Sequence, residues 1–237
     1  MILGLALAGP AEPACRQALV LAVDISGSVD LREHGLQRQG LAAALLDAEV
    51  QAAFLELPAA PVRLLVFEWA GSFTQTDLTG WTEVRSAADL AAVARRLASA
   101  PRADGSAGTA TGQAMLYGAA RLAEQAACAR LTLDISTDGV RNAGVTPGLV
   151  RRQPEMQGVI VNGLAIGTGW PSRAGAETQL DRILWFLETE VVQGPDAFVE
   201  IADGFEDFER AMKLKLIREL TTRIVGQAGP PAPEGRG

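Results

Sequence analysis

Short apolar runs alternate along the chain with longer stretches in which apolar residues recur every three or four positions. The short runs are rich in Val, Leu and Ile and predict buried strands over 18–24, 62–68, 131–137, 159–166 and 197–202. The longer stretches predict amphipathic helices over 31–56, 86–99, 111–127, 146–156, 178–190 and 205–224. Apolar strands separated by helices are typical of a parallel sheet covered on both faces, so we predict an α/β fold.

The segment 69–81, WAGSFTQTDLTGW, interrupts this alternation. It is too polar and too short for a helix that crosses between parallel strands, and it therefore predicts a hairpin and an antiparallel edge strand. The expected architecture is a three-layer, doubly wound, mostly parallel sheet with one antiparallel edge strand. Since the chain has no internal repeat, we expect one domain over 15–225.

Composition and charge narrow the classes of partner. The 237 residues are 48% hydrophobic and 21% charged, which is typical of a globular chain. The net charge of -7, with no basic stripe in the sequence, argues against a nucleic-acid partner. No segment after the N-terminus approaches the roughly 20 apolar residues that a membrane span needs, so we expect no transmembrane segment.

The two ends of the chain differ from the rest. Residues 1–14 resemble the remnant of a secretory signal peptide, with an apolar start and small residues before Cys15, although a basic first segment is missing. We therefore expect a periplasmic or secreted protein rather than a cytosolic one. Residues 226–237 are rich in Pro and Gly and predict a disordered tail.

Oxygen-bearing side chains gather where predicted strands end and helices begin. The strand 18–24 ends at Asp24 and is followed by Ser26 and Ser28, which share its parity and can point to the same spot. Thr109, in DGSAGTATGQAM, precedes a predicted helix, and Asp138, in LTLDISTDGVRNAG, follows a buried strand. Ligands bind beyond the carboxyl ends of strands in sheets of this kind, so these residues form a candidate site.

Two carboxylates and three hydroxyls are hard oxygen donors, which suit Mg²⁺ completed by water. Ser-Gly-Ser after a strand, taken alone, is more often a turn with helix-capping hydroxyls. The ordered set of five donors favours the metal site over that simpler interpretation.

The sequence resembles the von Willebrand factor type A domain with its metal-ion-dependent adhesion site. The resemblance is carried by DISGS at 24–28, GTATGQAM at 108–115 and STDGVRNAG at 136–144, and it spans about 17–224. The opening LVLAVDISGSVD and the closing GPDAFVEIADGFEDFERAMKLKLIREL are similar to a branch of bacterial exported proteins known only as a domain of unknown function.

The resemblance implies a Rossmann-like sheet with a divalent ion, Mg²⁺ or else Mn²⁺ or Ca²⁺, at its upper edge. Ser26, Ser28 and Thr109 would bind the ion directly, and Asp24 and Asp138 directly or through water. The ion would keep a solvent-facing position for an acidic side chain of a partner protein. The implied function is that of a protein-binding module without catalysis, and we expect a monomer whose partner the sequence does not identify.

The resemblance also bears on the two cysteines. Cys15 precedes Asp24 by nine residues and Cys128 precedes Asp138 by ten. The family topology places the two following strands side by side, which implies a Cys15–Cys128 disulfide at the opposite end of the sheet. Such a bridge fits an oxidising compartment. The alternative is that they are two unrelated small core residues.

Other polar residues receive simpler assignments. Asp134 lies deeper in its strand than Asp138 and is expected to be a buried acid with a hydrogen-bonded partner, or a support for the metal site. Asp30 is expected to stabilise the first turn of the next helix. His34, the only histidine, is expected to be exposed. Trp170 and Arg173 form a candidate partner-contact rim, or a loop anchor packed on the domain.

Two other functions use the same residues. A metal-dependent hydrolase or phosphoesterase would need a base beside Asp24 or Ser26, and the sequence shows no phosphate-binding Walker loop and no usable Ser/His/Asp set. A purely structural metal site is the third alternative.

Overall fold

The computed structural model describes residues 15–103, 107–167 and 178–221. One mixed sheet runs through the molecule in the order β3-β2-β1-β5-β6-β7, with β4 also paired to β2. The strands are β1 (Gln17–Asp24), β2 (Val62–Trp69), β3 (Gln75–Asp77), β4 (Thr82–Val84), β5 (Leu131–Thr137), β6 (Val159–Ile166) and β7 (Val199–Ala202). The pairs among β2, β1, β5, β6 and β7 are parallel, which confirms the predicted α/β class.

The outer edge of β2 is shared by two short antiparallel strands. β3 pairs with Phe67–Trp69 and β4 pairs with Val62–Leu64. The predicted hairpin after residue 69 is therefore present, and the edge position is divided between its second strand and a strand just beyond the predicted segment.

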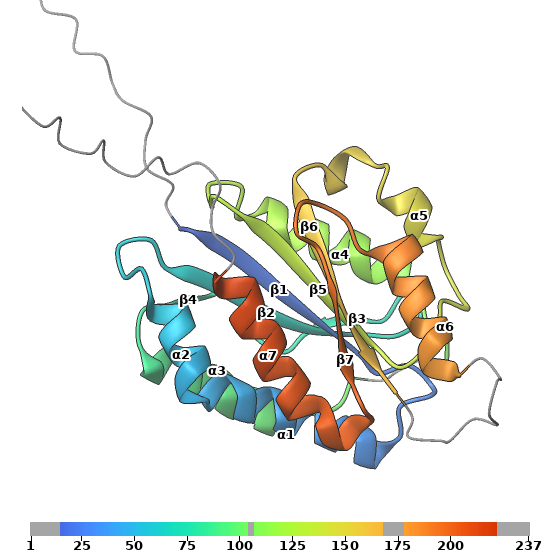
Figure 1. Cartoon of the computed structure of the whole chain (residues 1–237), viewed down its shortest axis with the longest axis horizontal. Coiled ribbons are helices and arrows are strands. Elements are labelled where there is room, and N and C mark those ends of the chain that lie inside the picture. Colours follow the sequence, from blue (N-terminus) through green and yellow to red (C-terminus); the bar gives the residue numbers. More distant parts are fainter. Residues whose placement is uncertain (1–14, 104–106, 168–177, 222–237) are drawn as a thin grey trace, which may run out of the picture.

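Helices cover both faces of the sheet (Figure 1). One face packs against α1 (Leu31–Leu46), α2 (Ala48–Leu55), α3 (Ala87–Ser99) and α7 (Phe208–Thr221). The other packs against α4 (Thr111–Ala123), α5 (Pro147–Val150) and α6 (Gln179–Phe186). Alternate residues of β1 supply the two cores, with Leu19, Leu21 and Val23 on the α1 side and Val20 and Ala22 on the α4 side.

Several predicted helices are divided. The predicted helix 31–56 breaks at Asp47, whose side chain accepts hydrogen bonds from the backbone N–H groups of Glu49 and Val50 and so starts α2. The predicted helix 146–156 is two short turns, α5 and the 3-10 turn η1 (Pro154–Met156), because proline cannot continue a helix. α6 continues as the π-helix η2 (Leu187–Val191), and α7 follows the 3-10 turn η3 (Phe205–Asp207).

Several sequence expectations fall on residues that the structure does not describe. These are the leader 1–14, the tail 226–237, and Trp170 and Arg173 of the candidate rim. Among the helices of the described ranges, none has the length and apolar character needed to cross a membrane.

The amino-terminal ends of β1 and β5 are joined covalently. Cys15 and Cys128 form a parallel bridge pair just before the two strands and are linked by a disulfide, with their Cα atoms 4.6 Å apart. The bridge lies opposite the carboxyl ends of the strands, as the family topology implied. It ties together residues separated by 113 positions in the sequence.

A buried ionic cluster joins the sheet to α7. The Lys215 ammonium lies 2.8 Å from Asp134 Oδ2 and 2.6 Å from Glu219 Oε1, and all three side chains are inaccessible to solvent. Asn162 Nδ2 donates to Glu219 Oε1 at 2.7 Å. Burial raises the pKa of Asp134 to about 7, and the charge of Lys215 opposes that rise. Asp134 is thus a buried acid with an ionic partner, as expected.

Replacement of Lys215 tests how strongly this cluster holds α7. Lys215→Met leaves Asp134 and Glu219 facing each other without their shared cation, so we expect a loss of about 3–5 kcal/mol in the free energy of unfolding at pH 8. Urea denaturation measures it. Lys213→Met on the same helix removes surface ion pairs to Asp47 and Glu49 and should cost less than about 1 kcal/mol. Equal losses in the two variants would contradict the assignment.

Candidate functional site

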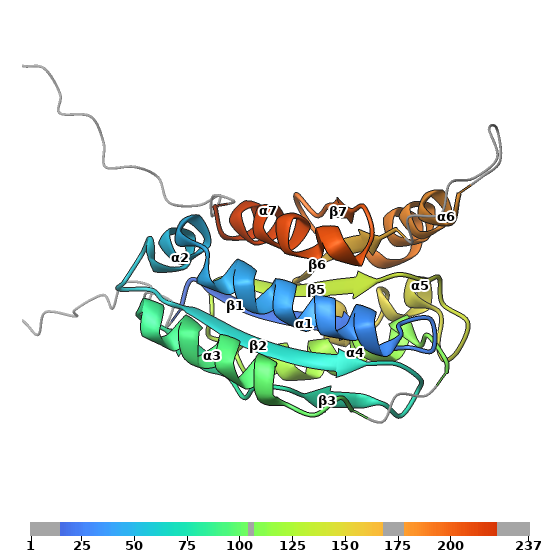
Figure 2. The same cartoon turned by 90° about the horizontal axis from the view of Figure 1, so that it is seen from below.

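The register of the central strands brings three chain segments to one edge of the sheet. Asp24 is paired with Trp69 at the end of β2, and Val23 is paired with Ser136 of β5. Asp24 therefore lies beside Thr137, and Asp138 follows immediately. Figure 2 shows β2 and β5 pointing to the same side of the molecule. Parallel pairing thus places the two acids, 114 positions apart, at the same edge.

Asp24 is fully buried and shapes the loop that follows it. Its Oδ1 accepts the backbone N–H of Ser26 at 2.7 Å, and its Oδ2 accepts the hydroxyl of Thr137 at 2.5 Å. These bonds turn the chain so that Ser26 and Ser28 lie on the same side as the carboxylate. Asp30 instead caps α1 by accepting from Glu33 N at 2.8 Å, as expected.

A chain of hydroxyls connects the remaining site residues. Thr109 Oγ1 donates to Ser26 Oγ at 3.1 Å, and Ser26 Oγ lies 3.3 Å from Ser28 Oγ. Ser28 Oγ then donates to Asp138 Oδ1 at 2.8 Å. Ser28 is exposed, whereas the other four side chains are buried. The structure therefore brings all five sequence-predicted residues together, with one of them at the surface.

Thr109 is held by the loop that follows β5. Its backbone N–H donates to Asn142 Oδ1 at 2.8 Å, and its carbonyl accepts from the backbone N–H groups of Asn142 and Ala143. At the start of α4, a Cβ on Gly112 would lie 2.2 Å from the carbonyl oxygen of Val145, so only glycine permits this close approach. The loop after Asp138 therefore helps to hold Thr109 at the site.

The two carboxylates place negative charge at the site without a compensating positive charge among the described residues. Burial, with a further contribution from nearby Asp138, raises the pKa of Asp24 to about 7. Burial also raises the pKa of Asp138, and the charge of Glu33 adds to this. Within the described ranges, neither acid forms an ion pair with a basic side chain. Two buried acids and three hydroxyls around one point suit a small, hard divalent cation.

The hydroxyls are essential to that fit. Nowhere in the described part of the chain do three or more His, Cys, Asp or Glu side chains gather as metal ligands. A cation at this edge would therefore depend on Ser and Thr oxygens as well as on the two carboxylates.

Sequence reasoning missed several residues that hold the site. Gln37 Nε2 donates to the carbonyl of Asp24 at 3.1 Å, and Gln179 Nε2 donates to the carbonyl of Asp138 at 2.9 Å. Only Thr137 had a signal in the sequence, because it stands at the strand end directly before Asp138. Glutamines within amphipathic helices carry no such signal.

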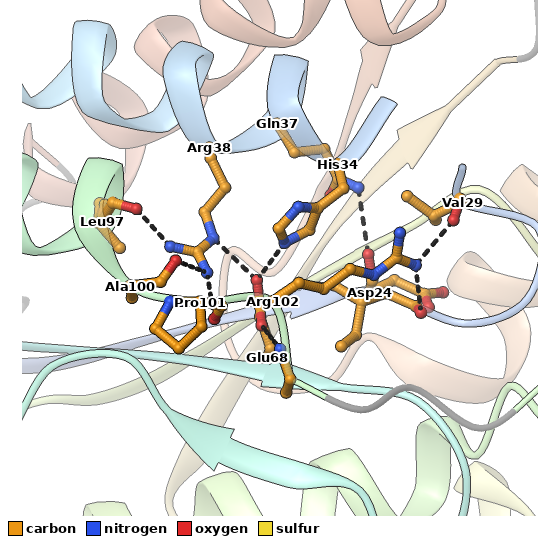
Figure 3. A network of polar contacts seen from close by, with 12 residues as sticks. Asp24, Val29, His34, Gln37, Arg38, Glu68, Leu97, Ala100, Pro101 and Arg102 are labelled. Atoms are coloured by element: carbon orange, nitrogen blue, oxygen red, sulfur yellow. Dashed lines mark hydrogen bonds and ion pairs between the residues drawn. The ribbon is translucent and has the colours of Figure 1, made fainter. Parts of the chain in front are cut away.

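The expectation that His34 is exposed is wrong. The side chain is buried on the inner face of α1, and its Nε2 lies 2.6 Å from Glu68 Oε1 on β2 (Figure 3). The error arises because Glu68, at the end of an apolar strand, turns its carboxylate inward to the α1 side. His34 and Arg38 both contact this buried carboxylate and compensate for its loss of hydration.

Comparisons with known proteins agree with this architecture. The proximal thread matrix protein 1 of the mussel byssus, with a zinc-occupied MIDAS motif, matches with a TM-score of 0.57 and 16% identity over 85% of this chain and 47% of its own. A von Willebrand factor type A protein from Catenulispora acidiphila matches with a TM-score of 0.51 and 19% identity over 87% of this chain and 43% of its own.

The manganese-loaded TRAP protein of Plasmodium vivax matches with a TM-score of 0.52 and 16% identity, covering 88% of this chain and 74% of its own. The chain thus spans less than half the length of the first two of these proteins. At such identities the likeness shows the fold, which is that of a von Willebrand factor type A domain.

No curated protein matches the chain. Residues 14–224 match the model of a family described as "Protein of unknown function (DUF1194)". Because this match covers most of the sequence, the chain belongs to the DUF1194 family.

Proposed function

We propose that the protein is a metal-dependent protein-binding module. A divalent ion, Mg²⁺ or else Mn²⁺ or Ca²⁺, is held directly by Ser26, Ser28 and Thr109, and by Asp24 and Asp138 directly or through water. The observation that carries the proposal is the pair of buried, mutually repelling carboxylates beside three hydroxyls, which form a chain from Thr109 through Ser26 and Ser28 to Asp138. A cation at that point relieves the repulsion and replaces the missing positive charge.

The side chains around this point also explain why it would bind a partner. When bound, the ion supplies a Lewis-acidic position for a further oxygen ligand. Neutral hydroxyls donate less charge to an ion than carboxylates do, so affinity for an additional anionic oxygen remains. The exposure of Ser28 leaves this side of the site open to solvent. An acidic side chain of another protein fits that position.

The arrangement of polar groups favours binding over hydrolysis. Hydrolysis by the Ser26 hydroxyl would need a base next to it, and the histidine of the chain is instead bonded to Glu68 on the α1 side of the sheet. The Ser26 hydroxyl contacts Ser28 and Thr109, and the neighbouring Asp24 carboxylate already accepts the Ser26 N–H and the Thr137 hydroxyl. We therefore propose no catalytic role for the site.

Two further observations support the proposal. Of the proteins with similar folds, the mussel protein has a zinc-occupied MIDAS motif and the Plasmodium protein is manganese-loaded. The Cys15–Cys128 disulfide fits an oxidising compartment, which supports export to the periplasm or the exterior. We expect the module to be a monomer.

Removal of two hydroxyls tests the ion site. Ser26→Ala together with Ser28→Ala should abolish Mg²⁺ binding in calorimetry, because the cation loses two of its neutral ligands, while circular dichroism remains that of the folded domain. The control variant Thr82→Ala with Ser99→Ala removes two hydroxyls that bond only to local backbone carbonyls elsewhere and should bind as the wild type does. Unchanged Mg²⁺ affinity in the site variant would rule out this ligand set.

Mg²⁺ affinity should depend on pH through Asp24. Because burial raises the pKa of its carboxyl to about 7, a proton competes with the cation below that pH. Ionisation is nearly complete at pH 8 and about one tenth at pH 6, so calorimetry should show about tenfold weaker binding at pH 6. An affinity that stays flat across this interval would contradict a directly competing carboxylate.

Capture of a partner should require both the ion and an acid. The immobilised wild-type domain should retain a protein from an extract of the source organism in Mg²⁺ and release it on addition of a chelator. The Ser26→Ala, Ser28→Ala variant should retain nothing. Conversion of the extract's carboxyl groups to amides should also abolish capture. Retention that survives the chelator or amidation would argue against recognition of an acid through the metal.

A further inference from the structure

A second buried network lies next to the site on the α1 side of the sheet (Figure 3). Its centre is the fully buried carboxylate of Glu68, the neighbour of Val23 across the β1–β2 pair. Glu68 accepts from Arg38 Nε at 2.8 Å and from the backbone N–H of Ala103 at 3.2 Å, besides its contact with His34. Burial alone raises the pKa of Glu68, but the His34 hydrogen bond and the Arg38 charge outweigh it and lower the pKa, so the carboxylate is ionised at neutral pH.

Arg38 uses its other nitrogens to fix the chain after α3. Its guanidinium donates to the carbonyls of Leu97, Ala100 and Pro101, the last two at 3.2 and 3.1 Å. Together with the bond from Ala103 to Glu68, these contacts hold 100–103 on both sides of Arg102. The network therefore presents Arg102 at a defined place.

Arg102 in turn closes the loop that carries two site residues. Its Nη2 donates to the carbonyl of Val29 at 2.8 Å and to that of Ile25 at 3.2 Å. These two carbonyls stand at either end of the Ser26–Ser28 segment, so one guanidinium ties the loop across its base. Figure 3 shows the side chain reaching this loop beside Asp24. The preceding carbonyl, that of Asp24, is held by Gln37.

The charge of Arg102 helps to distinguish a geometric role from an electrostatic one. A guanidinium bound to this loop repels a cation held by the same loop, so electrostatics alone would disfavour a basic residue here. The contacts show a geometric role instead, because both acceptors are backbone carbonyls rather than acids. If the Asp24–Val29 loop were not held in this way, it would have to order its backbone each time an ion bound, and that ordering lowers affinity.

We infer that Arg102 is a positioning residue for the metal site, which holds the Asp24–Val29 loop in its ion-binding conformation before the ion arrives. The inference rests on the proposed function, since it assigns Arg102 to the same divalent-cation site. Arg102 acts through the loop backbone and does not itself contact the ion.

Substitution of Arg102 separates positioning from charge. Arg102→Ala should weaken Mg²⁺ binding in calorimetry by about 10- to 100-fold, as for other residues that support metal ligands. A purely electrostatic role predicts tighter binding, because a repelling charge is removed. Arg102→Lys keeps the charge and can reach one carbonyl, so it should recover part of the affinity. Arg32→Ala, which removes an exposed charge on the first turn of α1 that pairs with Glu206 rather than with the site loop, should bind Mg²⁺ as the wild type does or more tightly.

Hydrogen exchange of the metal-free proteins supplies a measurement independent of ion binding. The backbone amides of Ser26 and Val29, which are bonded to Asp24 Oδ1 and to the Ser26 carbonyl, should exchange slowly in the wild type and in Arg32→Ala, and much faster in Arg102→Ala. Saturating Mg²⁺ should restore slow exchange in Arg102→Ala. If that variant does not fold, Arg102→Lys should show the same changes at smaller size.

The outcomes distinguish this inference from the function on which it rests. A wild type that does not bind Mg²⁺ overturns the proposed function and, with it, this assignment. A wild type that binds, with Arg102→Ala binding equally or more tightly, overturns only the positioning role. Unchanged exchange of the Ser26 and Val29 amides in a folded Arg102→Ala variant also overturns it.

Discussion

The structure depends on the parallel register of β1 with its two neighbours. β1 lies between β2 and β5, and the three strands end within one residue of each other. Because the carboxyl ends of parallel strands face the same edge, the loops after them meet there. At the other end of the same pair, the disulfide joins the residues that precede β1 and β5. The strand pair whose register brings Asp24 beside Thr137 is thus linked by a disulfide at its amino-terminal end and carries the polar site at its carboxyl end.

The buried acids of this sheet are balanced in different ways. Asp134 forms an ion pair with Lys215, and Glu68 interacts with Arg38 and His34, so both carboxylates have basic partners within the fold. Asp24 and Asp138 instead receive hydrogen bonds from hydroxyls and a backbone N–H, and these do not neutralise a charge. Asp134 and Glu68 are buried strand acids with basic side-chain partners, whereas the two site acids have none among the described residues. This difference supports the proposal of an external cation at the carboxyl ends of the strands.

The two buried networks have separate roles around that edge. Lys215 joins the middle of β5 to α7, well below the strand ends, and contributes to the packing of a layer. The Glu68 network lies at the level of the site and connects β2, α1 and the chain after α3 to the Asp24 loop. Sites that bind small ions need ligands held within narrow limits, and rigid neighbouring elements provide this more precisely than loops alone. The location of the second network suits that requirement.

The sequence by itself determined the strands, the α/β class and the positions of Asp24, Ser26, Ser28, Thr109 and Asp138 at strand ends or helix starts. These follow from local periodicity and from which residue ends each apolar run. The break at Asp47 was also readable, since Asp before Ala-Glu is a helix start signal, but the longer apolar period concealed it. Only the tertiary structure decided that His34 is buried on Glu68, that Lys215 lies between two acids, and that Arg102 closes the site loop. Apart from the i,i+4 pair of Lys215 and Glu219 within α7, those contacts join residues between 34 and 81 positions apart through strand register and helix packing, which local sequence patterns do not specify.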